Sequence, residues 1–289
     1  MSTWPPSLTD SAQSSLLSLA ADYSLSHGLI YRPPASTPSS TPSTTSSIHA
    51  PYSLFPAKFP SHLFHKAIAL QPLYNALYSH VTVDDAFLED VLGGAVSKVD
   101  EFQGRLLELW KQVRQEGIKQ PLHLGLFRSD YLLHSPPGCA PDKVTIKQVE
   151  FNTISSSFGP LATKVGDLHR YLQASGAYPE HEDLALENLP VNRALAGLAA
   201  GLAAGHKAYS NPSAKILMVV QDNERNAFDQ RALEWELLET FVLSLLPSLP
   251  LFTKPSHLSS TTATPSPSSE SPSPLSTSTP LSTPPPPLS

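Results

Sequence analysis

Apolar residues between positions 60 and 117 recur every three or four residues, which is the spacing of one face of an α-helix. This pattern predicts three successive helices that pack through their apolar faces. The first is broken near Pro72, the second ends at Gly93-Gly94 and the third ends at Gly117, because proline and glycine interrupt helices. The apolar positions are Leu63, Ala67, Ile68, Leu73 and Leu77 in the first helix, Phe87, Leu88, Val91 and Leu92 in the second, and Phe102, Leu106, Leu107, Trp110 and Val113 in the third.

Two short runs in the middle of the chain have the composition of β-strands. They cover His123–Phe127 and Thr145–Phe151, and the Pro136–Gly138 segment between them suits a turn. Because a short connection joins the two runs, we expect them to form neighbouring antiparallel strands.

The second half of the chain alternates helical and extended patterns. Helices are predicted over Leu161–Leu172, Asn192–Tyr209 and Gln230–Leu246, and a short buried strand over Lys215–Val220. Three glycines spaced four residues apart, at 197, 201 and 205, suggest that the second of these helices packs closely against a neighbour. This mixture of helices and strands predicts an α/β or α+β fold class.

Two segments have a composition that cannot form a core. Pro, Ser and Thr occupy 28 of the 35 positions from Pro255 to Ser289, so we expect the C-terminal region 247–289 to be a disordered tail. The run Pro33–Ser47 has the same composition apart from Ala35, which indicates a surface loop. The folded region is therefore expected to cover residues 1–246.

Composition and charge exclude several classes of protein. The net charge of −6 lacks the basic excess that a phosphate backbone attracts, so no nucleic-acid partner is expected. The single cysteine, Cys139, cannot form an intramolecular disulfide, which favours a reducing, intracellular location. The N-terminus lacks a signal-peptide pattern, and no apolar stretch approaches the roughly 20 residues of a membrane span.

The first of three polar clusters follows the predicted strand at His123–Phe127. It begins with Arg128, whose guanidinium could bind a carboxylate through two parallel hydrogen bonds. The alternative is that Arg128 only forms a surface ion pair with Asp130, and such exposed pairs stabilise proteins weakly.

The second polar cluster closes the strand from Thr145. Glu150 and Asn152 are two residues apart and therefore share one face of the strand, where their oxygens could bind Mg²⁺. The serines Ser155–Ser157 that follow could hold an anionic ligand through hydroxyl and backbone N–H groups. The alternative is that the two acceptors are only solvated and the serines cap a helix.

The third polar cluster, Gln221–Asn226, follows the predicted buried strand at Lys215–Val220. Glu224 could face an ammonium group, while Asn226 and Gln230 could hydrogen-bond amides or carboxylates, which together suit an amino-acid-like ligand. The alternative is an ordinary exposed loop that begins a helix.

Together the three clusters resemble eukaryotic glutathione synthetase over about Ser11 to Leu246. The strongest segments of the resemblance are Leu124–Tyr131, Lys147–Gly159 and Glu224–Ala232, supported by Ala50–Pro56 and Gln115–Ile118. The resemblance implies the substrate-side portion of an ATP-grasp-type ligase. Such an enzyme joins γ-glutamylcysteine to glycine through an acylphosphate, uses ATP and Mg²⁺, and is usually a cytoplasmic homodimer.

The resemblance also implies roles for individual residues. Glu150 and Asn152 would bind Mg²⁺, and Glu150 would also lie near ATP. The residues that would hold γ-glutamylcysteine are Arg128, Ile154, Ser155, Ser156, Ser157, Glu224, Arg225, Asn226 and Gln230.

The resemblance stops near Leu246, whereas the family's chain continues for a comparable length. That continuation carries the nucleotide-binding lysines, a Gly-rich lid loop, a further magnesium carboxylate and an Arg-Asp-Gly-Tyr substrate motif. We therefore expect this chain to be an incomplete glutathione synthetase that is inactive alone, with apolar surface exposed on the helix at Gln230–Leu246. The alternative is a non-catalytic module that holds γ-glutamylcysteine or pairs with a full-length subunit.

Overall fold

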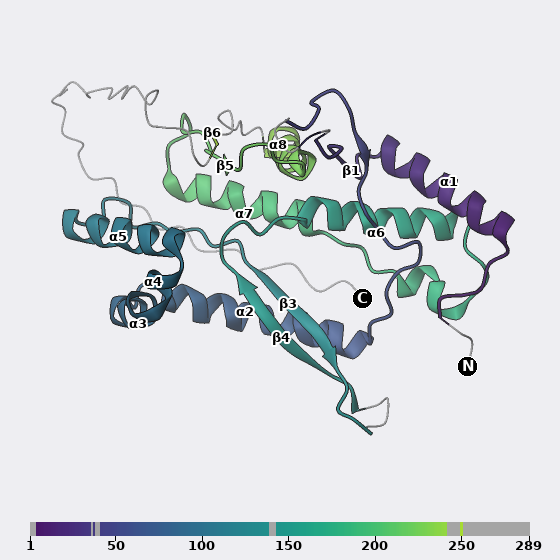
Figure 1. Cartoon of the computed structure of the whole chain (residues 1–289), viewed down its shortest axis with the longest axis horizontal. Coiled ribbons are helices and arrows are strands. Elements are labelled where there is room, and N and C mark those ends of the chain that lie inside the picture. The colour runs from purple at the N-terminus through teal and green to yellow at the C-terminus, as the bar shows by residue number, and fades with distance from the viewer. Residues whose placement is uncertain (1–3, 36, 38–40, 139–142, 242–248, 251–289) are drawn as a thin grey trace, which may run out of the picture. The chain divides into compact units, whose positions relative to one another are not determined.

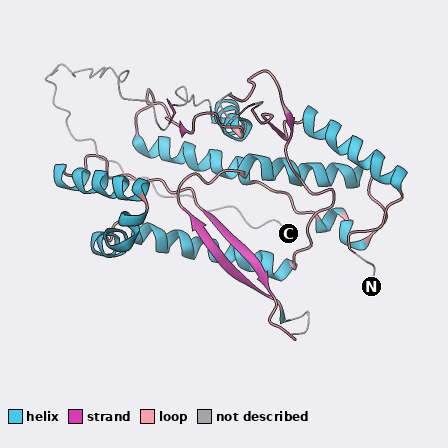
Figure 2. Ribbon diagram, in the orientation of Figure 1, coloured by secondary structure: helices cyan, strands magenta, loops and turns pink. Residues whose placement is uncertain are grey.

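The structure is a computed structural model that describes residues 4–35, 37, 41–138, 143–241 and 249–250. The predicted disordered tail at 247–289 lies outside these residues, apart from positions 249 and 250. Cys139 and the predicted domain boundary at 246 also lie outside the described residues. Helices make up most of the described chain, and the hairpin β3–β4 contains its longest strands (Figure 2). No helix among the described residues is long and apolar enough to cross a membrane.

The buried core lies between α1 (Asp10–Ser26) and α6 (Gly159–Ala174), which run side by side (Figure 1). Thr9 begins α1 by accepting a hydrogen bond from the Ala12 N–H through its side chain. The short strands β1 (Ile30–Tyr31) and β2 (Ile48–His49) pair antiparallel beside α1, and the 3₁₀ turns Glu182–Leu184 and Leu186–Asn188 follow α6. The core residues are Leu16, Ala20, Leu29, Ala50, Leu161, Leu168, Leu172, Tyr178 and Leu184.

The predicted helix α6 is therefore confirmed, and so is α7 (Ala194–Tyr209). Close packing holds at two of the three α7 glycines: a Cβ added at Gly201 would meet Leu126 Cδ2 at 2.8 Å, and one at Gly205 would meet Leu124 Cδ2 at 2.9 Å. Gly197 has no heavy atom within 4 Å of such a Cβ. The helix α8 (Ala227–Phe241), which packs on α6 and α7, begins three residues before the predicted Gln230.

The helix α2 (Ser61–Val81) runs through Pro72 without the break that the sequence predicts. Proline removes one N–H, so the carbonyl of Ile68, four residues earlier, loses its helical partner. Because the Ile68 residue is 55% exposed, water can satisfy that carbonyl, and the helix continues.

A compact run of helices follows α2 and confirms the two remaining predicted helices. It contains α3 (Asp85–Val91), a kinked segment Leu92–Val96 in which the backbone of Gly94 is not helical, the short α4 (Ser97–Val99) and α5 (Glu101–Glu116). Side chains of Asp84 and Asp100 cap α3 and α5, and Gly117 ends α5 with a φ of 83°. The expected packing of the α5 apolar face is limited to the buried Leu107 and the partly buried Trp110, since Phe102, Leu106 and Val113 are exposed, as are several large apolar residues on α2 and α3.

The hairpin differs from the prediction at its first strand. Strand β3 covers Arg128–His134 rather than His123–Phe127, and it pairs antiparallel with β4 (Thr145–Asn152). The segment before β3 is instead a loop whose leucines, Leu124 and Leu126, approach α7. Phe151 of β4 stacks on Tyr78 of α2 with ring centroids 3.8 Å apart, which holds the hairpin against that helix (Figure 1).

The predicted buried strand at Lys215–Val220 is also shorter than expected. Only β5 (Val219–Val220) pairs as a strand, parallel to β6 (Leu249–Pro250). Alternate residues of the segment are exposed, including Leu217 and Val219, so the expectation of a buried strand was wrong.

Candidate functional site

The hairpin register brings the first two polar clusters together. Arg128 lies opposite Asn152, and Asp130 lies opposite Glu150, so these four side chains share one face of the hairpin. The Asn152 amide nitrogen Nδ2 lies 3.3 Å from Asp130 Oδ2 and 3.1 Å from Glu150 Oε1, close enough to donate to each carboxylate. We call these four residues the hairpin network.

Arg128 forms the ion pair with Asp130 that the sequence offered as the alternative. Its Nε and Nη2 donate to the two Asp130 carboxylate oxygens at 2.8 and 3.1 Å, and these hydrogen bonds hold the pKa of Asp130 below its usual range. The same guanidinium lies 3.8 Å from Glu150 Oε1. Arg128 therefore sits among several carboxylate oxygens, and one positive charge balances part of a cluster of two negative charges.

The loop after β4 is attached to the hairpin network by two hydrogen bonds. Arg128 Nη1 donates to the Ser157 carbonyl at 3.2 Å, and the Ser156 hydroxyl donates to the Asn152 carbonyl at 3.2 Å. Ser155 and Phe158 adopt left-handed backbone conformations with φ of 54° and 71°, which turn the chain sharply before α6. Ile154 and Ser155 are exposed on the outside of this turn.

The third cluster forms a second compact turn, before α8. The Glu224 side chain accepts a hydrogen bond from the Asn226 N–H at 2.7 Å. Arg225 is joined to Arg32 of the β1 segment by hydrogen bonds in both directions, at 3.0 and 3.2 Å. Asn226 is only 8% exposed, and its Oδ1 accepts no hydrogen bond from the described residues. A buried acceptor without a partner suits a ligand or water that carries an N–H or O–H group.

Asp229, in the first turn of α8, links the second and third clusters. Its carboxylate oxygens accept hydrogen bonds from the N–H groups of Phe158 and Leu161, at 2.7 and 3.0 Å. The residue is 3% exposed, and burial raises the pKa of its carboxyl group. Gln230 follows it in α8 and is partly buried.

The sequence-predicted residues thus form two joined groups. Arg128, Glu150 and Asn152 meet directly and are hydrogen-bonded to Ser156 and Ser157, whereas Ile154 and Ser155 are exposed. The segment Glu224–Asn226 connects to the loop through Asp229. The sequence interpretation missed Arg32, whose buried Nε also has no partner among the described residues. No local pattern marks Arg32, because it pairs with a segment 193 positions away.

The donor set at Glu150 and Asn152 fits Mg²⁺. The Glu150 side chain is 56% exposed, so its carboxylate can face a cation and water, and the Asn152 amide can present its oxygen after rotation about its terminal bond. No group of three or more His, Cys, Asp or Glu residues suited to a metal occurs in the part of the chain that the structure describes. Two protein oxygens match Mg²⁺, which retains water and phosphate ligands, better than a metal that needs a full protein cage.

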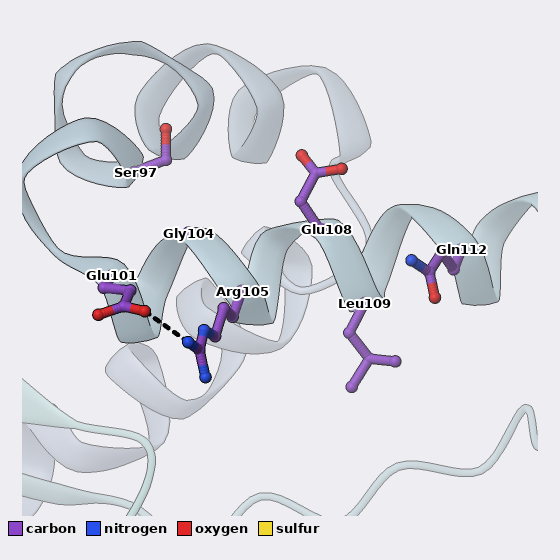
Figure 3. Close-up of a pocket in the computed structure, with 7 residues that line it drawn as sticks. All are labelled: Ser97, Glu101, Gly104, Arg105, Glu108, Leu109 and Gln112. Atoms are coloured by element: carbon purple, nitrogen blue, oxygen red, sulfur yellow. Dashed lines mark hydrogen bonds and ion pairs between the residues drawn. The ribbon is translucent and has the colours of Figure 1, made fainter.

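Two cavities lie elsewhere and contain no residue of the hairpin network. One groove of about 480 Å³ follows α5, with the Glu101–Arg105 ion pair at one end (Figure 3). A second, of about 520 Å³, lies between α2, α6 and the segment Leu189–Arg193. Neither cavity is lined by a residue of the three polar clusters.

The fold and the relatives define the class and then the family. The structure resembles that of a glutathione synthetase-like effector from Globodera pallida, with a TM-score of 0.66 at 22% identity, over 85% of this chain and 51% of that one. The fold is therefore that of the glutathione synthetase-like proteins. The family model for the eukaryotic glutathione synthase ATP-binding domain matches residues 10–264. The chain belongs to the eukaryotic glutathione synthase family.

Curated relatives agree with this family. The chain is 38% identical to the glutathione synthetase of Homo sapiens over 236 residues, which cover 81% of this chain and 47% of that protein. It is 35% identical to the glutathione synthetase large chain of Schizosaccharomyces pombe, over 77% of this chain and 47% of that one. The chain thus spans about half the length of the curated relatives it matches.

Proposed function

We propose that this chain supplies the γ-glutamylcysteine-binding and Mg²⁺-binding face of a glutathione synthetase. In this reaction ATP phosphorylates the cysteinyl carboxylate, and the glycine amine displaces phosphate to form the peptide bond. The observation that carries the proposal is the hairpin network, in which Arg128, Glu150 and Asn152 meet on one face. The names of the relatives supply the reaction.

The proposed ligand of the two turns is γ-glutamylcysteine, which carries an ammonium group, two carboxylates and an amide. Arg128 would pair with a carboxylate, and Glu224 would face the ammonium group. The unpartnered Asn226 Oδ1 supports a ligand N–H at this position. The residues proposed to complete the binding surface are Ile154, Ser155, Ser156, Ser157, Arg225 and Gln230.

Glu150 and Asn152 would hold Mg²⁺ beside the ATP phosphates. When bound, the ion would neutralise phosphate charge during carboxylate activation. The chain's own contribution is electrostatic. The positive charge of Arg128 offsets part of the negative charge of Asp130 and Glu150, which reduces their repulsion of a negatively charged substrate.

The assembly that we propose is a cytoplasmic homodimer, as the family resemblance suggests. We also propose that a polypeptide of these 289 residues binds γ-glutamylcysteine without ligating it, since it spans about half the length of its relatives. The second candidate function is the alternative stated from the sequence, a non-catalytic module that pairs with a full-length subunit.

Isothermal titration calorimetry of the 289-residue polypeptide with γ-glutamylcysteine tests the proposal. We expect binding that Arg128→Ala weakens by about tenfold or more, because a charge-assisted hydrogen bond is lost. The matched control is Arg105→Ala, which removes an exposed arginine that is also paired with a carboxylate, that of Glu101. Absence of binding by the unmodified chain, or equal losses in both variants, would contradict the proposed site.

Two further measurements separate the catalytic and non-catalytic candidates. An assay of ATP-dependent glutathione formation should detect none with this polypeptide alone, and product formation would refute that part of the proposal. Native mass spectrometry of a mixture with a full-length relative would reveal a mixed dimer if the chain acts as a pairing module.

A further inference from the structure

The helix α6 is capped by a residue far away in the chain. Its N-cap residue, Phe158, has no side chain that can accept a hydrogen bond, and the first turn of α6 contains no acidic residue. Asp229 supplies the missing acceptor from α8, with Oδ2 bound to the Phe158 N–H and Oδ1 bound to the Leu161 N–H. A carboxylate at this position also faces the positive end of the helix dipole.

Phe158 directly follows the loop Ile154–Ser157, and Leu161 lies in the first turn of α6. The left-handed conformation of Phe158 places a sharp turn between that loop and α6. The left-handed conformation is uncommon for a bulky residue, and the hydrogen bond from the Phe158 N–H to Asp229 stabilises it. The capping contact therefore constrains the direction in which the loop enters α6.

The other side of Asp229 is attached to the third cluster. Its own N–H donates to the Asn226 carbonyl at 3.2 Å, and Gln230 is its neighbour in α8. A single residue thus contacts the chain on both sides of the proposed γ-glutamylcysteine site. Because the residue is 3% exposed and both of its oxygens accept hydrogen bonds, it is not available to touch a ligand directly.

We propose that Asp229 is a positioning residue that fixes the loop Ile154–Ser157 relative to Glu224–Asn226. This inference rests on the proposed function, because it assigns both segments to one ligand. The competing interpretation is that Asp229 only stabilises the fold. Positioning requires that a change at Asp229 alters the two segments more than an equally destabilising change elsewhere in α8.

The test compares Asp229→Asn with two controls. Asparagine keeps one acceptor but replaces the other oxygen with an NH₂ group, so one of the two helix N–H groups loses its partner. Glu239→Gln removes the same charge from an exposed position of α8 that lies outside the three polar clusters. Leu237→Ala removes a fully buried side chain from α8 and therefore lowers stability without removing the capping contact.

Binding of γ-glutamylcysteine is the first measurement, at a temperature where all variants are folded by circular dichroism. We expect Asp229→Asn to weaken binding by about tenfold or more, while Leu237→Ala and Glu239→Gln remain within about twofold of the unmodified chain. Equal affinity for Asp229→Asn and Leu237→Ala would overturn the inference.

Amide hydrogen exchange is the second measurement, and it needs no ligand. We expect Asp229→Asn to accelerate exchange at Phe158 and Leu161, and in Glu224–Asn226, by more than Leu237→Ala does at matched global stability. A uniform acceleration across the chain would overturn the inference. If the unmodified chain does not bind γ-glutamylcysteine, the proposed function fails, but this measurement still decides whether Asp229 couples the two segments.

Asp229→Glu provides a second variant if Asp229→Asn does not fold. Glutamate keeps the charge but has a longer side chain, so it should preserve helix content while shifting the loop. We expect weakened binding and altered exchange at Phe158; a glutamate variant with unchanged affinity and unchanged exchange would contradict positioning.

Discussion

Acidification below pH 6.5 is expected to destabilise this protein through His169. The residue is 7% exposed, and its Nδ1 lies 2.6 Å from the Tyr178 hydroxyl oxygen. Because the Tyr178 hydroxyl donates its only hydrogen to the Leu54 carbonyl at 2.9 Å, Nδ1 must carry the proton that joins it to Tyr178. Burial lowers the pKa of His169 from 6.5 to about 4, so the folded state holds a neutral imidazole above that pH.

The size of the effect follows from that pKa difference. The unfolded chain takes up a proton at His169 near pH 6.5, whereas the folded chain does so only near pH 4. The contribution of His169 to stability is therefore complete above pH 6.5 and is lost as pH falls toward 4. At about 1.4 kcal/mol per pH unit, this loss amounts to about 3 kcal/mol.

Urea unfolding at pH 7.0, 5.5 and 4.5 measures this contribution. His169→Gln is the reference, because glutamine can hydrogen-bond Tyr178 but does not titrate. The free energy of unfolding of the unmodified chain should fall relative to that of His169→Gln as pH decreases. The difference between them should change by about 2 kcal/mol between pH 7.0 and 4.5, because the loss is complete only below pH 4. A difference that is the same at all three pH values would refute the buried neutral imidazole.

Two other expectations concern the metal site and α7. Mn²⁺ can substitute for Mg²⁺, and its binding can be measured by electron paramagnetic resonance. Glu150→Gln should weaken Mn²⁺ binding by about tenfold, while the exposed control Glu108→Gln should not, and equal effects would contradict a site at Glu150. Gly197→Ala should raise the free energy of unfolding by about 1 kcal/mol, because alanine favours a helix and the added methyl group meets no neighbouring atom. Gly201→Ala should raise the free energy of unfolding by less, because Leu126 must shift. The reverse order in chemical denaturation would contradict the packing of α7.

The elements that the sequence predicts correctly have local signals. Asp100 and Gly117 mark the two ends of α5, and glycines interrupt the chain after α3. Where prediction fails, a nonlocal contact or solvent exposure decides the outcome. Leu124 and Leu126 resemble strand residues, but they pack against the α7 glycines instead, and the strand begins at Arg128.

The helix α1 shows a different limit of sequence analysis. Its apolar residues alternate with serine and alanine, so the sequence contains only a weak apolar stripe, yet Leu16 and Ala20 are buried against α6. Tertiary packing rather than local amphipathicity explains this helix.

The candidate site divides in the same way. Arg128, Glu150 and Asn152 could be grouped from sequence, because an antiparallel hairpin places nearby residues on one face. Arg32 and the capping role of Asp229 could not, since their contacts join segments 68 to 193 positions apart. A polar residue in a first helical turn predicts a contact within its own helix, and nothing local indicates that Asp229 caps another one.

A few long-range contacts therefore determine how the three clusters are positioned relative to one another. Each cluster has a local reason for its residue types, but Arg128 attaches the loop to the hairpin through the Ser157 carbonyl, and Asp229 attaches the same loop to α8. The loop is thus held at its C-terminal end, at the adjacent residues Ser157 and Phe158. A ligand that spans the hairpin and the α8 turn would thus meet serines whose positions depend on Arg128 and Asp229 together. Because the two contacts share one loop, the effects of changing them should not be additive, and a double-mutant cycle of Arg128→Ala with Asp229→Asn should show a coupling energy of about 0.5 kcal/mol or more.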